Sequence, residues 1–191
     1  MAWKLIFIPV ALLILLGTGM FVFVKETAPE NPQINAPSLK FYQSDAFKIS
    51  FSYPDRLYLQ ERIGTGRPGE RLVLVLVEDT PGNRDLIEGR SPLATEEPPS
   101  ITIDVFQNTK GLTADEWAKE DANWAMGSRE LRPVVVGDVS GISFFWDGLY
   151  SGKTAIVTQD RLVYALSVTW ITPDDLLIKD FDALLDSIKF E

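Results

Sequence analysis

The sequence predicts an α+β protein, in which a mostly antiparallel sheet is flanked by helices in an α/β/α sandwich that follows one N-terminal transmembrane helix. The first reason is the uncharged apolar run Leu5–Val24. The second is a series of short strand patterns joined by brief turns. The third is a pair of amphipathic helical patterns together with one strand that is apolar on both faces, because such a strand needs a covering layer on each side of the sheet.

The apolar run Leu5–Val24 lies between Lys4 and Lys25. At ~1.5 Å per residue it matches the ~30 Å hydrocarbon core of a bilayer. We therefore expect residues 1–25 to be a membrane anchor or uncleaved signal that binds the lipid bilayer. The tiny N-terminal tail favours a single-pass protein whose domain lies outside the cytoplasm.

Two alternatives remain for this segment. A secretory signal could be cleaved near the small residues Gly17–Gly19, which would release a secreted protein, although the apolar run continues beyond them. A buried core helix is the other alternative.

Residues 26–38 contain three prolines and no apolar periodicity, which predicts a semi-rigid linker. Fully extended, this linker would reach about 40 Å at ~3.1 Å per residue. Residues 39–191 then form one globular domain with a single core. The chain carries a net charge of −9, and the domain keeps that charge because Lys and Glu balance in the segments before it. An acidic domain is a poor ligand for nucleic acid or an anionic lipid surface, so we predict no nucleic-acid partner.

Four strand patterns open the domain. Residues Phe47–Tyr53 and Ile101–Val105 alternate between apolar and polar side chains, and Leu57–Ile63 is a weaker strand pattern. Residues Leu72–Val77 are apolar at every position, which predicts a central strand covered on both faces.

A helix follows with a strong start signal. Thr113 and Glu116 have the spacing of a capping box. Trp117 and Trp124 should lie on one face of the helix, and Gly127 should end it.

Four further strands form an antiparallel meander, at Val134–Val139, Ile142–Tyr150, Thr154–Thr158 and Leu162–Trp170. We expect the turns at Ser140-Gly141, Ser151-Gly152 and Gln159-Asp160. In the fourth strand one face should carry Leu162, Tyr164, Leu166, Val168 and Trp170.

The last helix is expected to begin at Thr172 as its N-cap, with Pro173 in the first helical position and Asp174 and Asp175 near the positive end of the helix dipole. Its apolar stripe should consist of Leu177, Phe181, Leu184, Leu185 and Ile188.

Three segments resemble the PsbP-like family. They are Asp45–Pro54, an alternating strand that ends in Tyr-Pro; Val136–Gly141, a strand and turn; and Asp186–Phe190, a closing segment. The resemblance runs from about Phe41 to Phe190, with Ala46 where the family usually has glycine. It implies an α/β/α sandwich that acts as a non-enzymatic binding module, often on the outer side of a membrane. No metal-site motif of the family matches this chain.

The composition excludes several chemistries. Without cysteine or histidine, the chain cannot form disulfides, Cys/His zinc sites or catalytic triads that use a histidine base. We therefore predict neither an enzyme nor a cofactor.

Two glycine motifs are expected to be decoys. Gly64–Gly69 matches the dinucleotide-binding pattern, but Pro68 interrupts it and a strand follows where a helix is required. Gly152-Lys153-Thr154 resembles the end of a phosphate-binding loop but lacks the earlier glycine, so we expect a tight turn.

The long segment Asp79–Ser100 is the best candidate for a partner-binding loop, because loops of this length inside compact domains are usually functional or disordered. Residues 85–88 could make one helical turn. Its candidate contact residues are Asp79, Asp85, Glu88, Arg90, Glu96 and Glu97. Phe145-Trp146 is a second surface candidate, since adjacent strand residues face opposite ways, although we favour a core role for the pair.

These observations favour a membrane-tethered, extracytoplasmic binding or assembly module whose partner is a membrane-associated protein complex. One alternative is an accessory domain stabilised by Ca²⁺ or Mn²⁺, since carboxylates are the abundant oxygen ligands here. A carboxylate-based hydrolase is the other.

Overall fold

A computed structural model describes residues 38–64, 66–91, 96–120 and 130–191. None of the helices within these ranges is long and apolar enough to cross a membrane. The predicted anchor Leu5–Val24, most of the predicted linker, and Trp124 and Gly127 lie outside the described residues.

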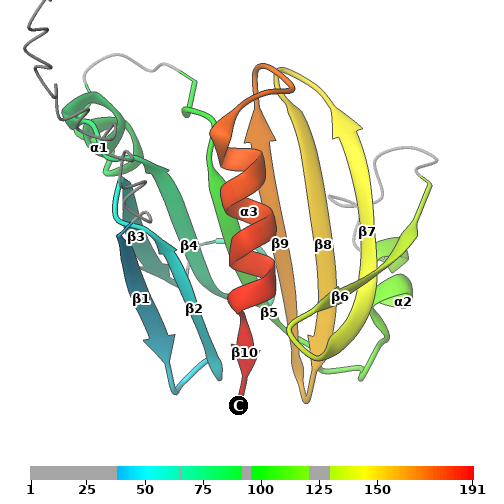
Figure 1. The fold of residues 1–191 in the computed structure, drawn as a ribbon. Helices are drawn as coiled ribbons and strands as arrows, with labels where there is room; N and C mark the ends of the chain where they lie inside the picture. The colour runs from blue at the N-terminus through cyan, green and yellow to red at the C-terminus, as the bar shows by residue number, and fades with distance from the viewer. Residues whose placement is uncertain (1–37, 65, 92–95, 121–129) are drawn as a thin grey trace, which may run out of the picture. The chain divides into compact units, whose positions relative to one another are not determined.

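The described domain contains two antiparallel sheets where the sequence predicts one (Figure 1). The larger sheet has the strand order β3-β4-β5-β9-β8-β7-β6, and the smaller has the order β1-β2-β10. The strands are β1 (Leu39–Ser44), β2 (Ile49–Pro54), β3 (Leu57–Ile63), β4 (Glu70–Glu78), β5 (Ile101–Gln107), β6 (Arg132–Val136), β7 (Val139–Asp147), β8 (Ser151–Gln159), β9 (Leu162–Trp170) and β10 (Lys189–Phe190).

Helices cover both faces of the larger sheet. Helix α3 (Leu176–Ser187) and the smaller sheet lie on one face, where they share a core with Leu74, Tyr164 and Leu166. Helices α1 (Pro81–Ile87) and α2 (Ala114–Glu120) lie on the other face, over separate apolar clusters (Figure 1). The prediction of a sheet covered on both faces is confirmed, but a small sheet contributes to one of the covering layers.

Strand β4 is buried on both faces, as its continuous apolar pattern predicts. Leu72, Leu74 and Leu76 face the core beneath α3, whereas Val75 and Val77 face α1. The strand is not central, because only β3 separates it from the sheet edge. Strand β9 has the predicted bounds, and all five residues of its predicted face contact the core beneath α3.

The smaller sheet corrects the reading of the first strand. Strand β2 begins at Ile49 and not at Phe47, because residues 45–48 form a turn in which Lys48 has φ 49°. Strand β1 was not predicted at all, and it pairs with β2 from Leu39 opposite Pro54 to Ser44 opposite Ile49.

The start of α2 agrees with the sequence prediction, and the start of α3 differs from it. The capping box of α2 is present: the Thr113 amide donates to the Glu116 carboxylate at 2.9 Å and the Glu116 amide donates to Thr113 Oγ1 at 3.3 Å. Helix α3 begins later than predicted, since Asp175 is its N-cap and accepts the Leu177 amide at 3.0 Å. The predicted cap Thr172 instead accepts the Asp175 amide in a preceding turn. The buried stripe of α3 is as predicted.

The meander turns lie elsewhere than predicted. Ser140-Gly141 and Ser151-Gly152 are inside strands, and the first two turns fall at residues 137–138 and 148–150. The third turn is Asp160-Arg161, one residue later than expected. Gly152 lies beneath the Trp146 ring, where an added Cβ would come within 2.3 Å of ring carbons, so this glycine permits close packing within a strand.

Candidate functional site

One end of the larger sheet gathers the loops that carry the candidate residues. Strand pairing places Glu78 beside Leu57, Leu76 beside Ile101, and Trp170 beside Ser151. The loops that follow β4, β7 and β9 therefore lie at the same end. The chain also enters β1 here, because the Asp55 amide donates to the Ser38 carbonyl at 2.9 Å.

Helix α1 orders the first part of the predicted loop. Thr80 caps this helix by accepting the Asn83 amide at 3.2 Å, and Pro81 occupies the start, where a missing N–H costs nothing. The helix replaces the single turn predicted at residues 85–88. Its buried residue Ile87 packs on Val75 and Val77 of β4.

Ion pairs connect the charged residues around α1. Arg84 binds Asp79 at 2.5 Å, and Arg90 binds Asp85 at 2.8 Å and also contacts Glu88. With Pro81, all of these residues except Glu88 line an open groove of about 390 Å³. Each predicted carboxylate in this part of the loop therefore has an arginine partner, which leaves the groove nearly neutral.

Aromatic and polar contacts hold this cluster against β3. The Tyr58 hydroxyl donates to Glu88, and the Arg84 guanidinium lies over the Tyr58 ring at 4.6 Å from its centre. Arg62 donates to the Ile87 carbonyl. Tyr58 and Arg84 are not among the contact residues predicted from the sequence, although Arg84 lies only five positions after Asp79.

Glu96 and Glu97 belong to a different part of the surface. Both side chains are exposed, and the Glu97 carbonyl accepts the Tyr150 hydroxyl at 3.0 Å. The structure thus divides the predicted contact residues between the α1 groove, with Asp79, Asp85, Glu88 and Arg90, and the neighbourhood of the β7–β8 loop.

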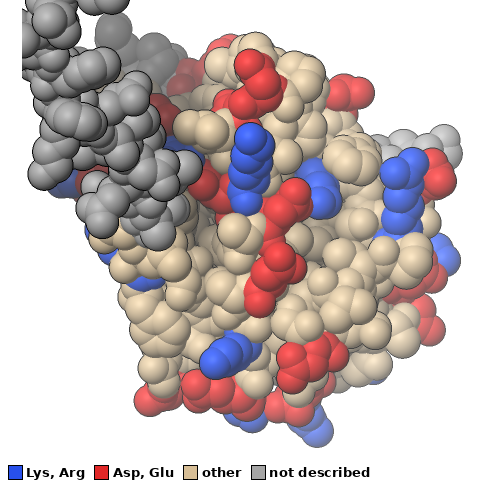
Figure 2. Space-filling model, in the orientation of Figure 1, with Lys and Arg blue, Asp and Glu red and all other residues tan. Residues whose placement is uncertain are grey.

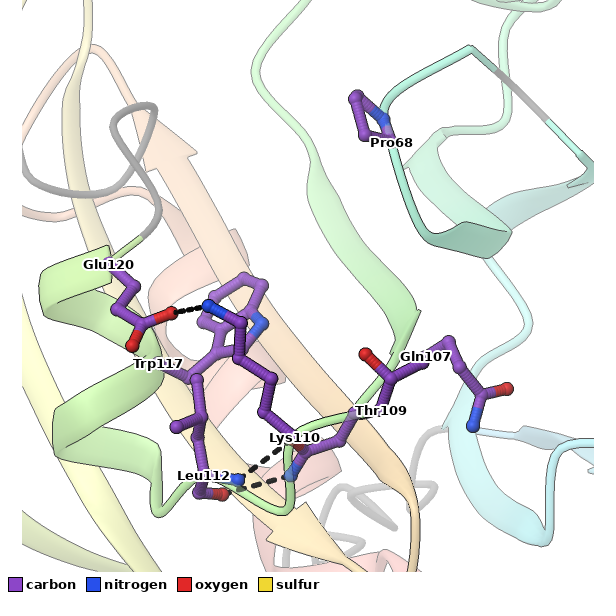
Figure 3. A pocket seen from close by; sticks show the side chains of 8 residues that line it. Pro68, Gln107, Thr109, Lys110, Leu112, Trp117 and Glu120 are labelled. Carbon is purple, nitrogen blue, oxygen red and sulfur yellow. Dashed lines mark hydrogen bonds and ion pairs between the residues drawn. The ribbon is translucent and has the colours of Figure 1, made fainter.

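A second groove, of about 340 Å³, lies at the opposite end of the sheet (Figure 3). Figure 3 shows Lys110 and Glu120 joined across its rim at 2.5 Å, with the Trp117 ring behind them. Asn108 is buried in its wall, where its side chain donates to the Leu112 carbonyl and accepts the Leu112 amide, each at 2.9 Å. Asn108, Lys110 and Glu120 thus have partners within the groove, and the Gln107 side chain donates to the Arg161 carbonyl at 3.0 Å.

Buried charges lie close to this second groove. Arg67 contacts both Glu70 and Asp104 and lies over the Phe106 ring at 5.0 Å from its centre. Burial raises the pKa of Asp104 to about 6, even though the guanidinium of Arg67 opposes that change. One arginine therefore serves two buried carboxylates.

The described residues contain no group of three or more Asp or Glu side chains placed to hold a metal ion. Neither glycine motif opens a helix. Gly64, Gly66 and Gly69 all have positive φ in the β3–β4 loop, and no helix follows them. Gly152-Lys153-Thr154 lies within β8 and does not form the predicted turn.

Exposed apolar side chains are the feature that sequence reasoning largely missed. Phe145 is 53% exposed, contrary to the favoured core role, whereas its neighbour Trp146 packs against the α2 cluster. The alternation of Phe145 and Trp146 was a usable signal. Leu149, Ile171 and Leu176, in or beside loops, gave no such signal.

No protein-family model matches the chain, and no curated protein matches it. Among solved structures, the chain is similar to the solution structure of cyanobacterial PsbP (CyanoP) from Synechocystis sp. PCC 6803, with a TM-score of 0.50, 15% identity, and coverage of 83% of this chain and 96% of that chain. It is also similar to a crystal structure from Bacteroides thetaiotaomicron VPI-5482, with a TM-score of 0.49, 12% identity, and coverage of 80% of this chain and 48% of that chain. The resemblance first seen in three sequence segments is confirmed for the architecture, and the domain has a PsbP-like fold.

Proposed function

We propose that this protein is a membrane-tethered, non-enzymatic binding or assembly module whose domain lies outside the cytoplasm and contacts a membrane-associated protein complex. The proposal rests mainly on one observation, that the candidate binding features gather at the end of the sheet where the chain enters β1. Loops from three strands meet there and present the α1 groove, the exposed Glu96 and Glu97, and exposed apolar side chains.

The chemistry of both grooves favours binding over catalysis. Around α1 the carboxylates are paired with arginines. In the second groove the Asn108 amide binds the Leu112 backbone, and Lys110 binds Glu120. A catalytic acid or base needs a group that is free to exchange a proton with a substrate. Exposed apolar and aromatic side chains surrounded by a polar rim are instead typical of a protein interface.

The tethering part of the proposal is tested by fractionation. The full chain should remain in the membrane pellet after an alkaline wash, and its intact mass should include residues 1–25. Recovery of a soluble species that begins near Met20 would refute the tether in favour of a cleaved signal.

The binding part is tested by affinity purification from native membranes with charge-reversal variants. Glu96→Lys combined with Glu97→Lys changes two exposed side chains at the proposed end of the domain. Asp138→Lys combined with Glu191→Lys makes the same change in charge at exposed positions near the opposite end. We expect the first pair to reduce recovery of the partner complex and the second pair to leave it unchanged. Equal recovery with both pairs would place the interface elsewhere.

The cation-dependent alternative makes a separate prediction. A ligand that binds only the folded state raises the melting temperature. We expect Ca²⁺ and Mn²⁺ to leave the melting temperature unchanged, and a rise that saturates with either ion would support the alternative.

A further inference from the structure

We propose that the apolar shelf, defined as Phe145, Leu149, Trp170, Ile171 and Leu176, binds a partner segment that is apolar on one side and basic on the other. This inference rests on the proposed binding function, and it adds the contact surface and the chemistry of the partner.

Four of the five side chains in the apolar shelf are exposed. Leu149, Ile171 and Leu176 are 67%, 69% and 55% exposed. Phe145 is 53% exposed and meets the partly buried Trp170 edge to face, with ring centres 6.4 Å apart. Single exposed apolar residues are ordinary, but a contiguous group of them marks an interaction site.

Strand pairing brings the residues of the shelf together. Ser151 pairs with Trp170, so the β7–β8 loop with Leu149 lies beside the chain that leaves β9 at Ile171. Phe145 is on the same face of the sheet as α3, because its strand neighbour Lys153 reaches Asp182 of that helix at 2.9 Å. Figure 1 shows the β7–β8 loop and the β9–α3 loop side by side above the sheet.

The charged residues around the shelf are mainly acidic. Two basic residues there are engaged, since Lys153 binds Asp182 and Arg132 binds Glu130 at 3.0 Å while lying over the Phe145 ring. A third, Lys179, is exposed one turn after Leu176 in α3. Asp147 and Asp174 form no ion pair within the part of the chain that the structure describes. Figure 2 shows acidic side chains over α3, with a basic side chain among them, beside uncharged surface. An apolar surface with an acidic rim complements a basic, apolar segment and disfavours an anionic lipid surface.

The shelf is continuous with the predicted loop. The Tyr150 hydroxyl binds the Glu97 carbonyl, so the acidic pair Glu96 and Glu97 extends the rim of the shelf. This contact joins the surface that the sequence predicts to the surface that the structure adds.

A peptide-binding experiment with the full chain in zwitterionic nanodiscs tests the proposal. The probe is a fluorescent synthetic helix of leucine and lysine, and its charge control is a helix of leucine and glutamate. The test variant is Leu149→Ser with Ile171→Ser. The matched control is Ile63→Ser with Val135→Ser, at positions 70% and 62% exposed and outside the shelf. Because every nanodisc carries the same lipid, differences between variants report the protein surface alone.

We expect the test variant to bind the basic helix about tenfold or more weakly than wild type, since two apolar side chains no longer leave water on binding. The matched control should bind like wild type, and the acidic helix should bind none of them. Equal affinity of wild type and the test variant would overturn the proposal. The binding result does not depend on where the protein is found in the cell. The proposed shelf can therefore be refuted while the proposed tethering stands, and the tethering can be refuted while the shelf stands.

Two other occupants have their own outcomes. The chain contains no cysteine, so a fluorophore on Leu149→Cys reports one site. Quenching of that fluorophore by brominated lipid would place the shelf on the bilayer, and loss of a dimer only in the test variant would assign it to a second copy of the chain. Either outcome would overturn the proposed partner chemistry.

Discussion

Replacing Gly137 with alanine should destabilise the domain more than its place in a surface turn suggests. Gly137 has φ 56°, which alanine adopts at a cost of about 1–2 kcal/mol. An added Cβ would also lie 2.5 Å from the Ile188 carbonyl oxygen. Relieving such a contact costs about 1–3 kcal/mol. The expected total loss of unfolding free energy is therefore roughly 2–5 kcal/mol.

The Ile188 carbonyl has little freedom to retreat. Ile188 is the C-cap of α3 and is itself buried. The next residues form β10, in which Lys189 pairs with Ser50 and Phe190 with Ile49. The Gly137 amide also donates to the Leu185 carbonyl at 3.3 Å, so movement of the turn would break a second contact.

Gly111→Ala is the matched control. Gly111 has φ 67°, yet an added Cβ would meet nothing within 4 Å. The control therefore carries the backbone cost alone, about 1–2 kcal/mol. Urea unfolding of residues 36–191, monitored by tryptophan fluorescence, measures both losses of unfolding free energy. In thermal unfolding, Gly137→Ala should have a melting temperature roughly 2–12 °C below that of the control. Equal losses would show that the turn does not press on the end of α3.

Three further predictions use the same domain. Phe181→Ala should lower the free energy of unfolding by about 3–5 kcal/mol because Phe181 is fully buried. Leu176→Ala on the same helix should lower it by less than about 0.5 kcal/mol. If denaturant titration gave only a small loss for Phe181→Ala, α3 would not pack on the sheet. The folded-state pKa of Asp104 is raised to about 6, above its unfolded value, so its contribution to stability is present below about pH 4 and is lost as pH rises through about 6. Wild type should accordingly lose roughly 2–3 kcal/mol relative to Asp104→Asn between pH 4 and pH 7, and a pH-independent difference in their unfolding free energies would contradict this. Asp175→Ala should cost about 1 kcal/mol as loss of an N-cap, and Thr172→Ala should lower the melting temperature less; the opposite order would make Thr172 the cap.

Periodic patterns were the dependable part of the sequence. The face of β9, the buried stripe of α3 and the capping box of α2 were predicted from spacing alone and are present. These elements are long or have a covered face, so the hydrophobic pattern and the local hydrogen bonds indicate the same secondary structure. Strand β1 shows no such pattern, because Leu39 and Phe41 are both exposed and the strand is defined by its pairing with β2.

Glycines account for most of the misplaced turns. Gly141 and Gly152 read as turn residues, but each lies within a strand where a neighbour approaches closely. An added Cβ on Gly141 would come within 2.1 Å of the Ile156 carbonyl oxygen. Close approach and turn formation select the same residue type, so only the tertiary structure distinguishes them.

The candidate site was predicted less completely than the fold. The carboxylates of the long loop were identified, but their pairing with arginines depends on α1, whose start at Pro81 was not anticipated. The apolar shelf was missed because its members come from strand ends and loops that are distant in sequence. Such surfaces depend on the topology of the fold, and no periodic pattern in the sequence predicts them.

The family resemblance itself has a structural explanation that separates fold from partner. Parts of its three segments meet at one end of the domain: β10 pairs with the start of β2, Gly137 contacts the end of α3, and the Tyr164 hydroxyl donates to the Phe47 carbonyl at 2.9 Å. These residues close the smaller sheet onto the larger one. The shelf and the α1 groove lie at the opposite end, in loops that contribute nothing to this closure. Because these residues serve the architecture, the PsbP-like fold at 15% identity shows the fold and no partner, and the proposed partner is to be sought through the charge and apolar character of the loops.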